Sequence, residues 1–420
     1  MRLNEFALAG MELVMIKKVS ILKLATMSIL STFFIVSITS CQSSNTKDMD
    51  TIINAISDEE LEKSGLKLIA REGKGALLEK DGQKIIILKG TPYELGYQHG
   101  VLLKDEVSAL AKKIIEKISE VKPDELQKAW DMTEKFIPER YKEELKGLAD
   151  GADIKLEEAQ LANMFPELFH CSGIVLFGKA TKDGDLLHAR VLDYATEQGI
   201  QDHSIVMIIQ PDGYNTFINA GMAGLIGSVT GMNDKQIAIG EIGGGGEGEW
   251  EGIPMTFLMR MAMEETSTLK DSIDIFKKSP RTCEYFYVIS DAKIKDARVL
   301  YCTPKTFMTV KPGQNHPFLP SPPPKDALIA SEKERYTEAL KRVKENYGNI
   351  DKDLLIKILK RPVSMKSNLH NAIFIPKDLK MWLAIADDPS KTDFQACYQT
   401  YYEYDMALIL RYYFSLFKTI

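Results

Sequence analysis

The pattern of hydrophobic residues changes abruptly at Cys171, and this change restricts the folds that the chain can adopt. In residues 104–120, apolar side chains recur at the spacing of an amphipathic helix. From Cys171 onward, short apolar runs follow one another, separated by turn-forming pairs such as Asp183-Gly184. Helical and strand-like blocks in separate groups indicate an α+β fold, so we expect two packed antiparallel sheets covered by helices.

Apolar periodicity locates the individual helices and one early strand. Helices are expected at residues 104–120, 124–136, 139–149, 156–168, 254–265, 269–278, 331–346 and 352–359. The strand-like run KIIILK at residues 84–89 precedes the segment GTPYELGYQHG, in which glycine and proline mark a turn before a helix. The part of the mature chain before Cys171 is therefore expected to be mostly helical.

The N-terminus is predicted to be an export signal, residues 1–40. Lys17 and Lys18 precede a short apolar run at residues 29–38, which is the order of regions in a signal peptide. That run is shorter than a transmembrane helix requires. The tetrapeptide ITSC resembles the lipobox of bacterial lipoproteins, and the resemblance implies that Cys41 is lipidated.

These signals divide the chain into four expected parts. Residues 1–40 are the signal peptide, whose true start is expected at Met15, and residues 41–55 are a polar, lipidated tether. Residues 56–170 form the N-terminal helical segment, and residues 171–420 form the catalytic domain. The protein is accordingly expected to be exported and anchored through lipid to the cell envelope.

Composition excludes several functional classes. The 420 residues carry a net charge of −6, without a basic patch, so binding to nucleic acid is not expected. The six histidines are scattered, and the H-E-x-x-H, paired C-x-x-C and Walker A patterns are missing from the sequence, so neither a metal nor a cofactor is expected. With Cys171 as a free thiol, Cys283, Cys302 and Cys397 leave one cysteine unpaired, and no disulfide framework is predicted.

Three residues with complementary chemistry lie in two consecutive strand-like runs. Cys171 heads the run SGIVLFG, and Arg190 and Asp193 lie in the run LLHARVLDY. Cysteine attacks as the thiolate, and a nearby guanidinium favours that ionised form. A carboxylate can orient the base that removes the proton. A cysteine in an apolar strand is often a structural residue, but this combination favours a nucleophile.

Two longer motifs carry a resemblance to a known family. GTPYELGYQHG, residues 90–100, is similar to a propeptide signature, and residues 171–193 are similar to the start of a mature catalytic chain. Strings at residues 231–239 and 366–386 fit the same pattern. From about residue 85 to residue 415, the chain resembles the acyl-CoA:6-aminopenicillanic acid acyltransferase family of N-terminal-nucleophile hydrolases, peptidase family C45. More distantly it resembles the choloylglycine hydrolases.

The resemblance implies a four-layer αββα sandwich preceded by a helical propeptide that stays associated with the catalytic chain. It implies that the precursor cuts itself between His170 and Cys171. The Cys171 thiol would attack the preceding carbonyl, and water would open the resulting thioester. The freed α-amine of Cys171, with a pKa near 8, could then serve as the base. The implied substrate is a small acyl amide or acyl thioester, processed through an acyl-enzyme.

Family positions also suggest roles for single residues. Arg190 is expected near the thiol and the substrate carbonyl, and Asp193 is expected to hold the α-amine. Asn315, as an oxyanion donor, and Arg335, at a helix, are further candidates. One strand ends in Glu241 where choloylglycine hydrolases place an asparagine, so a backbone N–H of the glycine run is expected to replace that oxyanion donor.

Two other interpretations stay open at this point. Cys171 and His370, flanked by Asn368 and Asn371, could form a papain-type pair that needs no chain cleavage. Alternatively, the chain could be a non-catalytic envelope lipoprotein that keeps the fold and binds a ligand or partner. A fragment starting at Cys171 would separate the first interpretation from self-cleavage.

Overall fold

A computed structural model describes residues 49–121, 124–164, 170–194, 196–245, 248–316 and 321–417. Chain contacts divide the protein into Met1–Ser44 and Asn45–Ile420, and the fold described below is that of the second unit. The predicted signal peptide and the predicted lipidation site at Cys41 lie outside the described residues.

The strands form two sheets, A and B. Sheet A has the order β1-β2-β3-β6-β7-β8-β9-β10-β11-β12, and all its pairs are antiparallel except β3 with β6. Its strands are β1 (Lys67–Glu72), β2 (Gly75–Lys80), β3 (Gln83–Gly90), β6 (Ser204–Pro211), β7 (Phe217–Met222), β8 (Thr230–Asn233), β9 (Ile237–Gly245), β10 (Glu284–Asp291), β11 (Asp296–Cys302) and β12 (Phe307–Val310).

Sheet B is fully antiparallel, with the order β13-β4-β5-β14-β15-β16. Its strands are β13 (Ala327–Ala330), β4 (His170–Leu176), β5 (Leu187–Asp193), β14 (Asn368–Ile375), β15 (Lys380–Ile385) and β16 (Tyr402–Asp405). One backbone pair, His170 with Gly243, links β4 of sheet B to β9 of sheet A. The two sheets therefore meet at the residue that precedes Cys171.

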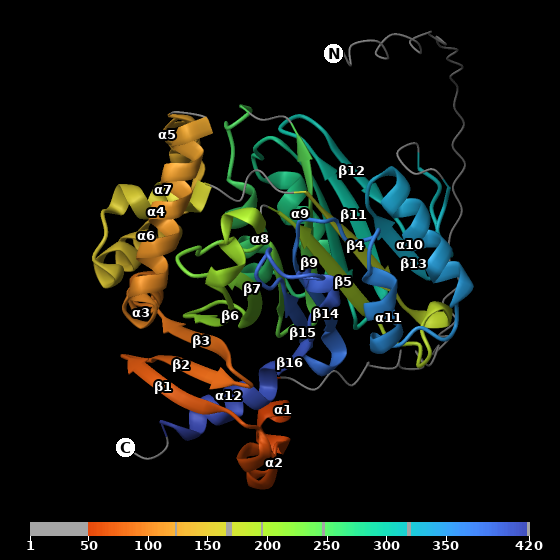
Figure 1. The fold of residues 1–420 in the computed structure, drawn as a ribbon, viewed down its shortest axis with the longest axis horizontal. Coiled ribbons are helices and arrows are strands. Elements are labelled where there is room, and N and C mark those ends of the chain that lie inside the picture. The colour runs from red at the N-terminus through yellow and green to blue at the C-terminus, as the bar shows by residue number, and fades with distance from the viewer. Residues whose placement is uncertain are drawn as a thin grey trace, which may run out of the picture. The chain divides into compact units, whose positions relative to one another are not determined.

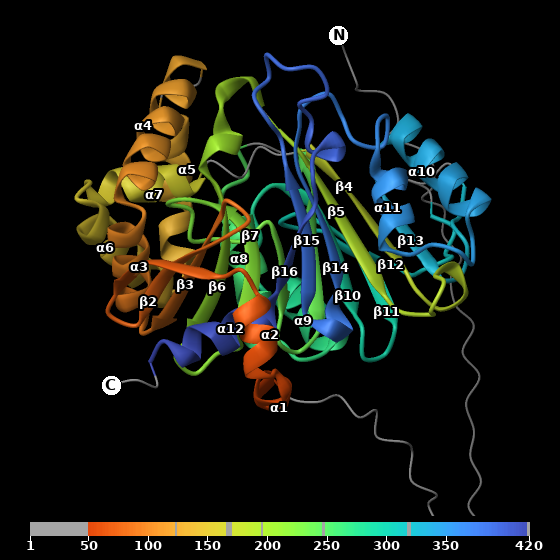
Figure 2. The ribbon, with the colours of Figure 1, turned by 60° about the horizontal axis from the view of Figure 1, so that its bottom comes forward.

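Helices pack against both sheets (Figure 1). They are α1 (Met49–Ala55), α2 (Asp58–Lys63), α3 (Pro92–Leu102), α4 (Lys104–Val121), α5 (Glu125–Thr133), α6 (Glu139–Ala152), α7 (Leu156–Met164), α8 (Met255–Glu265), α9 (Leu269–Lys278), α10 (Lys333–Glu345), α11 (Lys352–Leu359) and α12 (Met406–Ser415). The α3–α7 group and the α10–α11 pair lie on opposite sides of the sheets in both views (Figures 1 and 2).

Strand β3 shows how the core is organised. Ile85 and Ile87 belong to the core between the sheets, whereas Ile86 and Leu88 belong to the core under the helices. Successive side chains of a strand point to opposite faces, so a strand that is buried on both faces is continuously apolar. This explains the run KIIILK, and it confirms the expected mixed α+β fold with two sheets.

The segment before Cys171 is mostly helical, as expected for residues 56–170, but it also holds strands beyond the one expected. It contributes β1, β2 and β3, and β3 pairs in parallel with β6 from beyond Cys171. The runs KLIARE and GALLEK are short and partly polar, so their strand character depends on pairing: β1 pairs with β2, and β2 pairs with β3. Residues 49–55 were expected in a tether, but they form α1, whose Met49 and Ile53 are buried against the inter-sheet core.

The GTPYELGYQHG segment becomes the start of α3. Thr91 caps the helix in a reciprocal arrangement with Glu94, and Pro92 occupies the first turn. A Cβ atom at Gly96 would collide with the Glu144 carbonyl oxygen of α6, and one at Gly147 would collide with the Tyr93 carbonyl oxygen. The glycines therefore allow α3 and α6 to pack backbone to backbone.

Candidate active site around Cys171

Three neighbouring strands of sheet B bring polar side chains together at one end of the strands. Cys171 is the second residue of β4 and lies opposite Leu192 of β5, which in turn lies opposite His370 of β14. Arg190 is two residues from Leu192. Because side chains alternate along a strand, Arg190 projects from the same face as Leu192 and Cys171.

One guanidinium joins the thiol of sheet B to a carboxylate of sheet A. Arg190 Nη2 donates to Cys171 Sγ at 2.9 Å and to Glu241 Oε2 at 3.2 Å. Arg190 Nε donates to the Glu241 backbone carbonyl at 3.2 Å. Cys171 Sγ also donates to Glu241 Oε2 at 3.5 Å. The side chains of Arg190 and Glu241 are both inaccessible to solvent, so the thiol lies beside a fully buried ion pair.

The backbone of β9 makes this approach possible. A Cβ atom at Gly240 would lie 2.5 Å from Arg190 Cγ, so only glycine leaves room for the arginine stem. The next residue, Glu241, then accepts a hydrogen bond at Oε1 from the Gly243 backbone amide. The glycine-rich sequence GEIGG thus orients the carboxylate and admits its cation.

Asp193 is held by contacts from beyond β5. It forms an ion pair with Arg335 of α10 and accepts a hydrogen bond from the Met365 backbone amide at 2.9 Å. Arg335 also donates to the Val363 carbonyl at 2.8 Å. The Asp193 backbone lies opposite His170 in the β4–β5 ladder. Asp193 and Arg335, both selected from sequence, therefore lie together at the strand end that carries Cys171.

Burial dominates the ionisation of these groups. It raises the pKa of the Cys171 thiol well above its ordinary value, although Arg190 acts in the opposite direction. Burial likewise raises the pKa of Glu241 to about 7, again opposed by Arg190. The pKa of Asp193 is raised by burial and lowered in part by Arg335. In the uncleaved chain at neutral pH, the thiol is therefore protonated, and the raised pKa of Glu241 enables this carboxyl to accept a proton.

The papain-type pair is not formed in this structure. His370 Nε2 lies 3.0 Å from Thr230 Oγ1 and 3.5 Å from Arg190 Nη1, and burial lowers its pKa well below the usual value. Asn368 donates to the Leu192 carbonyl and to Asn371 Oδ1. Asn371 donates to Ser364 and Tyr401. Both asparagines are thus engaged in contacts that do not include Cys171.

A cavity of about 440 Å³ extends from Cys171 between the two sheets. Its walls include the apolar side chains of Ile242, Phe286, Val299, Val310 and Ile329, and its polar residues include Glu284, Tyr301, His316, Ser331 and Lys333. Asn315, the predicted oxyanion donor, is exposed and is not among the lining residues, whereas the adjacent His316 is. The structure therefore does not bring Asn315 to the thiol.

Glu241 is the site residue that sequence reasoning missed. It was noted only as a departure from the asparagine of choloylglycine hydrolases. Its place at the end of an apolar strand, before a glycine run, was a usable signal because that strand follows the GMN motif. What the sequence could not show is that β9 meets β4 and β5 from the other sheet.

Within the described ranges, no group of three or more histidine, cysteine or acidic side chains is arranged to hold a metal ion. Across the same ranges, every helix is too short or too polar to cross a membrane. The four cysteines found there, Cys171, Cys283, Cys302 and Cys397, are all buried, and none of them forms a disulfide bond.

A thiol beside a guanidinium and a carboxylate is a combination of groups that nucleophilic acyl transfer can use. The chain belongs to the acyl-coenzyme A:6-aminopenicillanic acid acyl-transferase family, whose model matches residues 180–390, half of the chain. This confirms the family resemblance, and members of this family are amidohydrolases or acyltransferases. The matched region contains Arg190, Asp193 and Glu241 and begins nine residues after Cys171.

Individual relatives are similar over part of their length. "Protein dcd1A" of Dictyostelium discoideum is 29% identical over 240 residues, which are 48% of this chain and 54% of that protein. Acid ceramidase of Balaenoptera acutorostrata scammoni is 24% identical over 194 residues, 39% of this chain and 47% of the relative. The chain thus spans about half the length of these curated relatives.

Among solved structures, the Caenorhabditis elegans N-acylethanolamine-hydrolyzing acid amidase ortholog aligns with 56% of this chain and 100% of its own, at 15% identity and a TM-score of 0.41.

Proposed function

We propose that this protein is a self-processing amidohydrolase or acyltransferase in which Cys171 becomes an N-terminal nucleophile. The observation that carries the proposal is the 2.9 Å hydrogen bond from Arg190 Nη2 to Cys171 Sγ at the start of β4. A guanidinium at this distance stabilises a thiolate once the proton has left. The family of amidohydrolases and acyltransferases to which the chain belongs supports the same chemistry.

Self-cleavage would begin with the thiol in the uncleaved chain. Glu241 Oε2, 3.5 Å from Cys171 Sγ, takes the thiol proton, and the sulfur attacks the carbonyl carbon of His170. The carbon–nitrogen bond breaks, the nitrogen leaves as the α-amine of Cys171 with that proton, and a thioester remains. Water then hydrolyses the thioester, which releases the His170 carboxylate and restores the thiol.

After cleavage, the α-amine of Cys171 acts as the base for its own thiol. The sulfur attacks the carbonyl of an acyl amide, the amine product leaves, and water or a second amine accepts the acyl group. The apolar walls of the adjacent cavity suit an acyl chain, because burial of apolar surface contributes about 25 cal/mol per Å². Because the Gly243 amide already donates to Glu241, the backbone amide of Gly244, also a cavity residue, is the proposed oxyanion donor.

The segment before Cys171 is proposed to remain bound as a separate chain of an N-terminal-nucleophile sandwich. Its α6 carries Glu144, which bonds Arg260 of α8 through Oε1 at 2.8 Å and Oε2 at 2.7 Å. Arg140 and Tyr141 of α6 bond Glu264 of α8 at 3.2 and 2.7 Å. Removing one partner of such a buried pair typically costs about 3–5 kcal/mol.

Export and lipidation at Cys41 are a separate proposal, supported by the sequence order of Lys17, Lys18 and the ITSC tetrapeptide. Labelling with a fatty-acid probe in a bacterial host, in wild type and in Cys41→Ala, tests it. Label in the wild type alone is expected, and equal labelling of the two proteins contradicts it.

The central experiment is intact-mass analysis and N-terminal sequencing of the purified protein. We expect a fragment that begins at Cys171 in the wild type, no such fragment in Cys171→Ala, and normal cleavage in Cys397→Ala, a matched buried-cysteine control. A panel of acyl amides of varied chain length then measures activity. A wild-type chain that is active while unbroken at position 170 would overturn self-processing and favour the papain-type interpretation.

The non-catalytic alternative has one observation in its favour. Cys171 is only 2% exposed, and burial raises the pKa of its thiol. A binding protein predicts an unbroken chain, no labelling by thiol-directed acylating probes and no turnover. A fragment starting at Cys171 together with turnover excludes it.

A further inference from the structure

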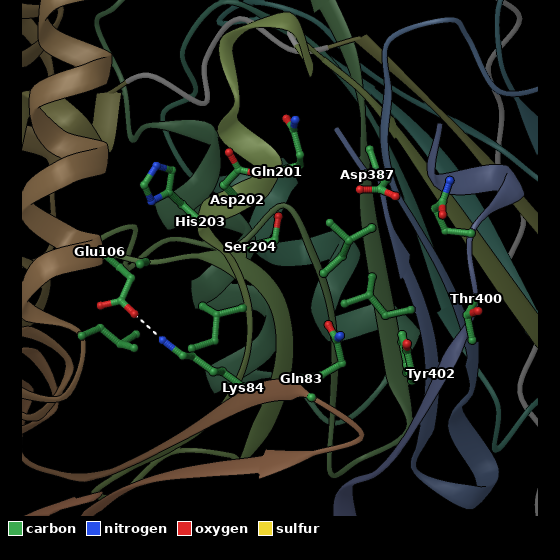
Figure 3. A pocket seen from close by; sticks show the side chains of 18 residues that line it. Gln83, Lys84, Glu106, Gln201, Asp202, His203, Ser204, Asp387, Thr400 and Tyr402 are labelled. Atoms are coloured by element: carbon green, nitrogen blue, oxygen red, sulfur yellow. Dashed lines mark hydrogen bonds and ion pairs between the residues drawn. The ribbon is translucent and has the colours of Figure 1, made fainter. Parts of the chain in front are cut away.

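A second cavity, of about 520 Å³, is shown in Figure 3. It lies at the same end of the sheet B strands as Cys171, as the strand register shows. Its lining includes Ile385 of β15, which lies opposite His370, and His370 in turn lies opposite Leu192, the partner of Cys171. Three strand spacings therefore separate the cavity from Cys171, roughly 14 Å. The strand ends of β5 and β14 lie between the two sites.

The lining of this cavity is polar, whereas the walls of the cavity at Cys171 are largely apolar. Amide and hydroxyl side chains line it, together with three carboxylates, as Figure 3 shows: Gln83, Gln201, Ser204, Thr400, Tyr402, Glu106, Asp202 and Asp387. Such groups both donate and accept hydrogen bonds, or accept two at once in the case of a carboxylate. A pocket of this size and composition suits a small polar molecule.

Three of the residues that line the cavity carry buried side-chain atoms without hydrogen-bond partners among the described residues. Within the described part of the chain, Gln201 Oε1, His203 Nδ1 and Ser204 Oγ are buried and have no hydrogen-bond partner. Gln201 as a whole is only 5% exposed. An unsatisfied buried polar group costs about 1–3 kcal/mol, and here three occur within four consecutive residues. A ligand that reaches these atoms, after small side-chain rotations, would relieve that cost.

The charges at the cavity are largely neutralised within the protein. Lys84 and Glu106 form an ion pair, drawn as a dashed line in Figure 3, and Asp387 is paired with Lys391 at 2.9 Å. Burial lowers the pKa of His203, so its imidazole is neutral near pH 7. Asp202 is the lining carboxylate that forms no ion pair within the described residues, so the site disfavours an anion and offers many hydrogen-bonding groups to a neutral ligand.

We propose that this cavity is a second binding site, distinct from Cys171, for a neutral polyhydroxylated compound of mono- or disaccharide size. Hydroxyl groups that both donate and accept would satisfy Gln201, His203 and Ser204 together. Asp202 can accept from two neighbouring hydroxyls. The ring of Tyr402 offers an apolar face with a polar tip, against which the C–H face of a sugar ring packs.

The site combines both sides of the proposed cleavage point. Gln83, Lys84 and Glu106 come from before Cys171, and Gln201 and Tyr402 come from after it. A bound ligand would contact both segments at once. Binding itself does not depend on cleavage, so this proposal can succeed or fail independently of the proposed enzyme activity.

The test is isothermal titration of the full chain with glucose, N-acetylglucosamine and lactose, each up to about 50 mM. We expect saturable binding of at least one saccharide in the wild type. The affinity should be at least tenfold weaker in Gln201→Leu and in Thr400→Trp. Thr400 is exposed, and a tryptophan at this position would fill the cavity. Ser390→Trp, exposed and not a lining residue, is the matched control and should bind normally.

Hydrogen exchange on the wild type gives a readout that no variant's folding can disturb. Bound saccharide should protect backbone amides near residues 82–84 and 200–204 together. The proposal is overturned if no saccharide binds, if binding is unchanged in Thr400→Trp, or if protection falls elsewhere. Binding of putrescine or inorganic phosphate alone would likewise overturn it, because the ligand would then be ionic.

Discussion

Arg190 donates from a single nitrogen, Nη2, to both the Cys171 sulfur and the Glu241 carboxylate, at 2.9 and 3.2 Å. Thiol and carboxylate therefore share one buried cation. When the proton moves from sulfur to carboxylate, the negative charge moves between two acceptors of the same guanidinium. Little reorganisation is needed for that transfer, and this is the property on which preorganised electrostatic catalysis depends.

The first prediction concerns the pH dependence of chain cleavage. The pKa of Glu241 is raised to about 7 by burial, so the ionised form, which can accept the Cys171 proton, accumulates as pH rises through 7. We expect the cleavage rate to rise between about pH 6 and 8 and then to level off, and Glu241→Gln to slow cleavage by ~10²–10⁴-fold. Gel quantification of the fragment starting at Cys171 measures the rate.

Glu345→Gln, on the exposed surface of α10, is the matched control for this experiment and should cleave like the wild type. A cleavage rate that falls as pH rises through 7, or that is unaltered in Glu241→Gln, would rule out the carboxylate as base.

The second prediction separates the charge of Arg190 from its geometry. Arg190→Lys keeps one positive charge but loses the planar fork that reaches Cys171, Glu241 and His370. We expect the variant to fold and to lose ~10²-fold in turnover of acyl amides. Arg190→Gln removes the charge and leaves Glu241 unpaired, so it should also lower the free energy of unfolding by about 3–5 kcal/mol.

Urea unfolding and turnover together test this pair of variants. Arg298→Gln on β11 removes a partly exposed ion pair with Asp296 and should change the free energy of unfolding by less than about 1 kcal/mol. If Arg190→Lys and Arg190→Gln lower the free energy of unfolding equally, then leaving Glu241 without a cation does not destabilise the protein further, and the prediction is wrong.

The third prediction concerns Asp193 and Arg335. Their ion pair connects β5 to α10, and Asp193 is also bonded by the Met365 amide. We expect a double-mutant cycle of Asp193→Asn and Arg335→Gln to give a coupling of about 0.5–3 kcal/mol in the free energy of unfolding. Arg335→Lys keeps the positive charge and should therefore keep part of that coupling energy. Independent, additive effects would mean that the contact does not hold the strand end.

The fourth prediction links pH to stability through Glu144. Burial raises its pKa to about 7, from an ordinary value of 4.5, so the folded state binds the proton more tightly than the unfolded state. The contribution is fully present below about pH 4.5 and is lost as pH rises through 7. At 1.36 kcal/mol per pKa unit, it amounts to about 3 kcal/mol.

Urea unfolding at a series of pH values, compared between wild type and Glu144→Gln, isolates this contribution. The loss of stability between about pH 4.5 and 7 should be smaller in the variant by that amount. Glu139→Gln, exposed on the same helix, should follow the wild type. Parallel curves for Glu144→Gln and the wild type would contradict the prediction.

Several elements were predictable because their signals are local. The helices at Leu269–Lys278 and Lys352–Leu359 have the expected bounds, since apolar spacing and capping residues define both ends. Strand β3 was recognised because it is apolar on both faces. By contrast, β1 and β2 are short, half-polar strands. The hairpins β1–β2 and β2–β3 are local, and Asp81-Gly82 between β2 and β3 was a turn signal that could have been used. The parallel pairing of β3 with β6 is a long-range contact that no local pattern reveals.

The site residues differ in the same way: some have local sequence signals, and others are brought in by long-range contacts. The order of Cys171, Arg190 and Asp193 along two adjacent strands, together with two motifs, was enough to select them and to assign the family, because β4 and β5 form a hairpin. Glu241 and the contact of Arg335 with Asp193 come from residues that are distant in sequence and from another sheet or helix. Only the packing of sheet A on sheet B decides which carboxylate faces the thiol, because burial and distance are properties of the folded chain and not of its local pattern.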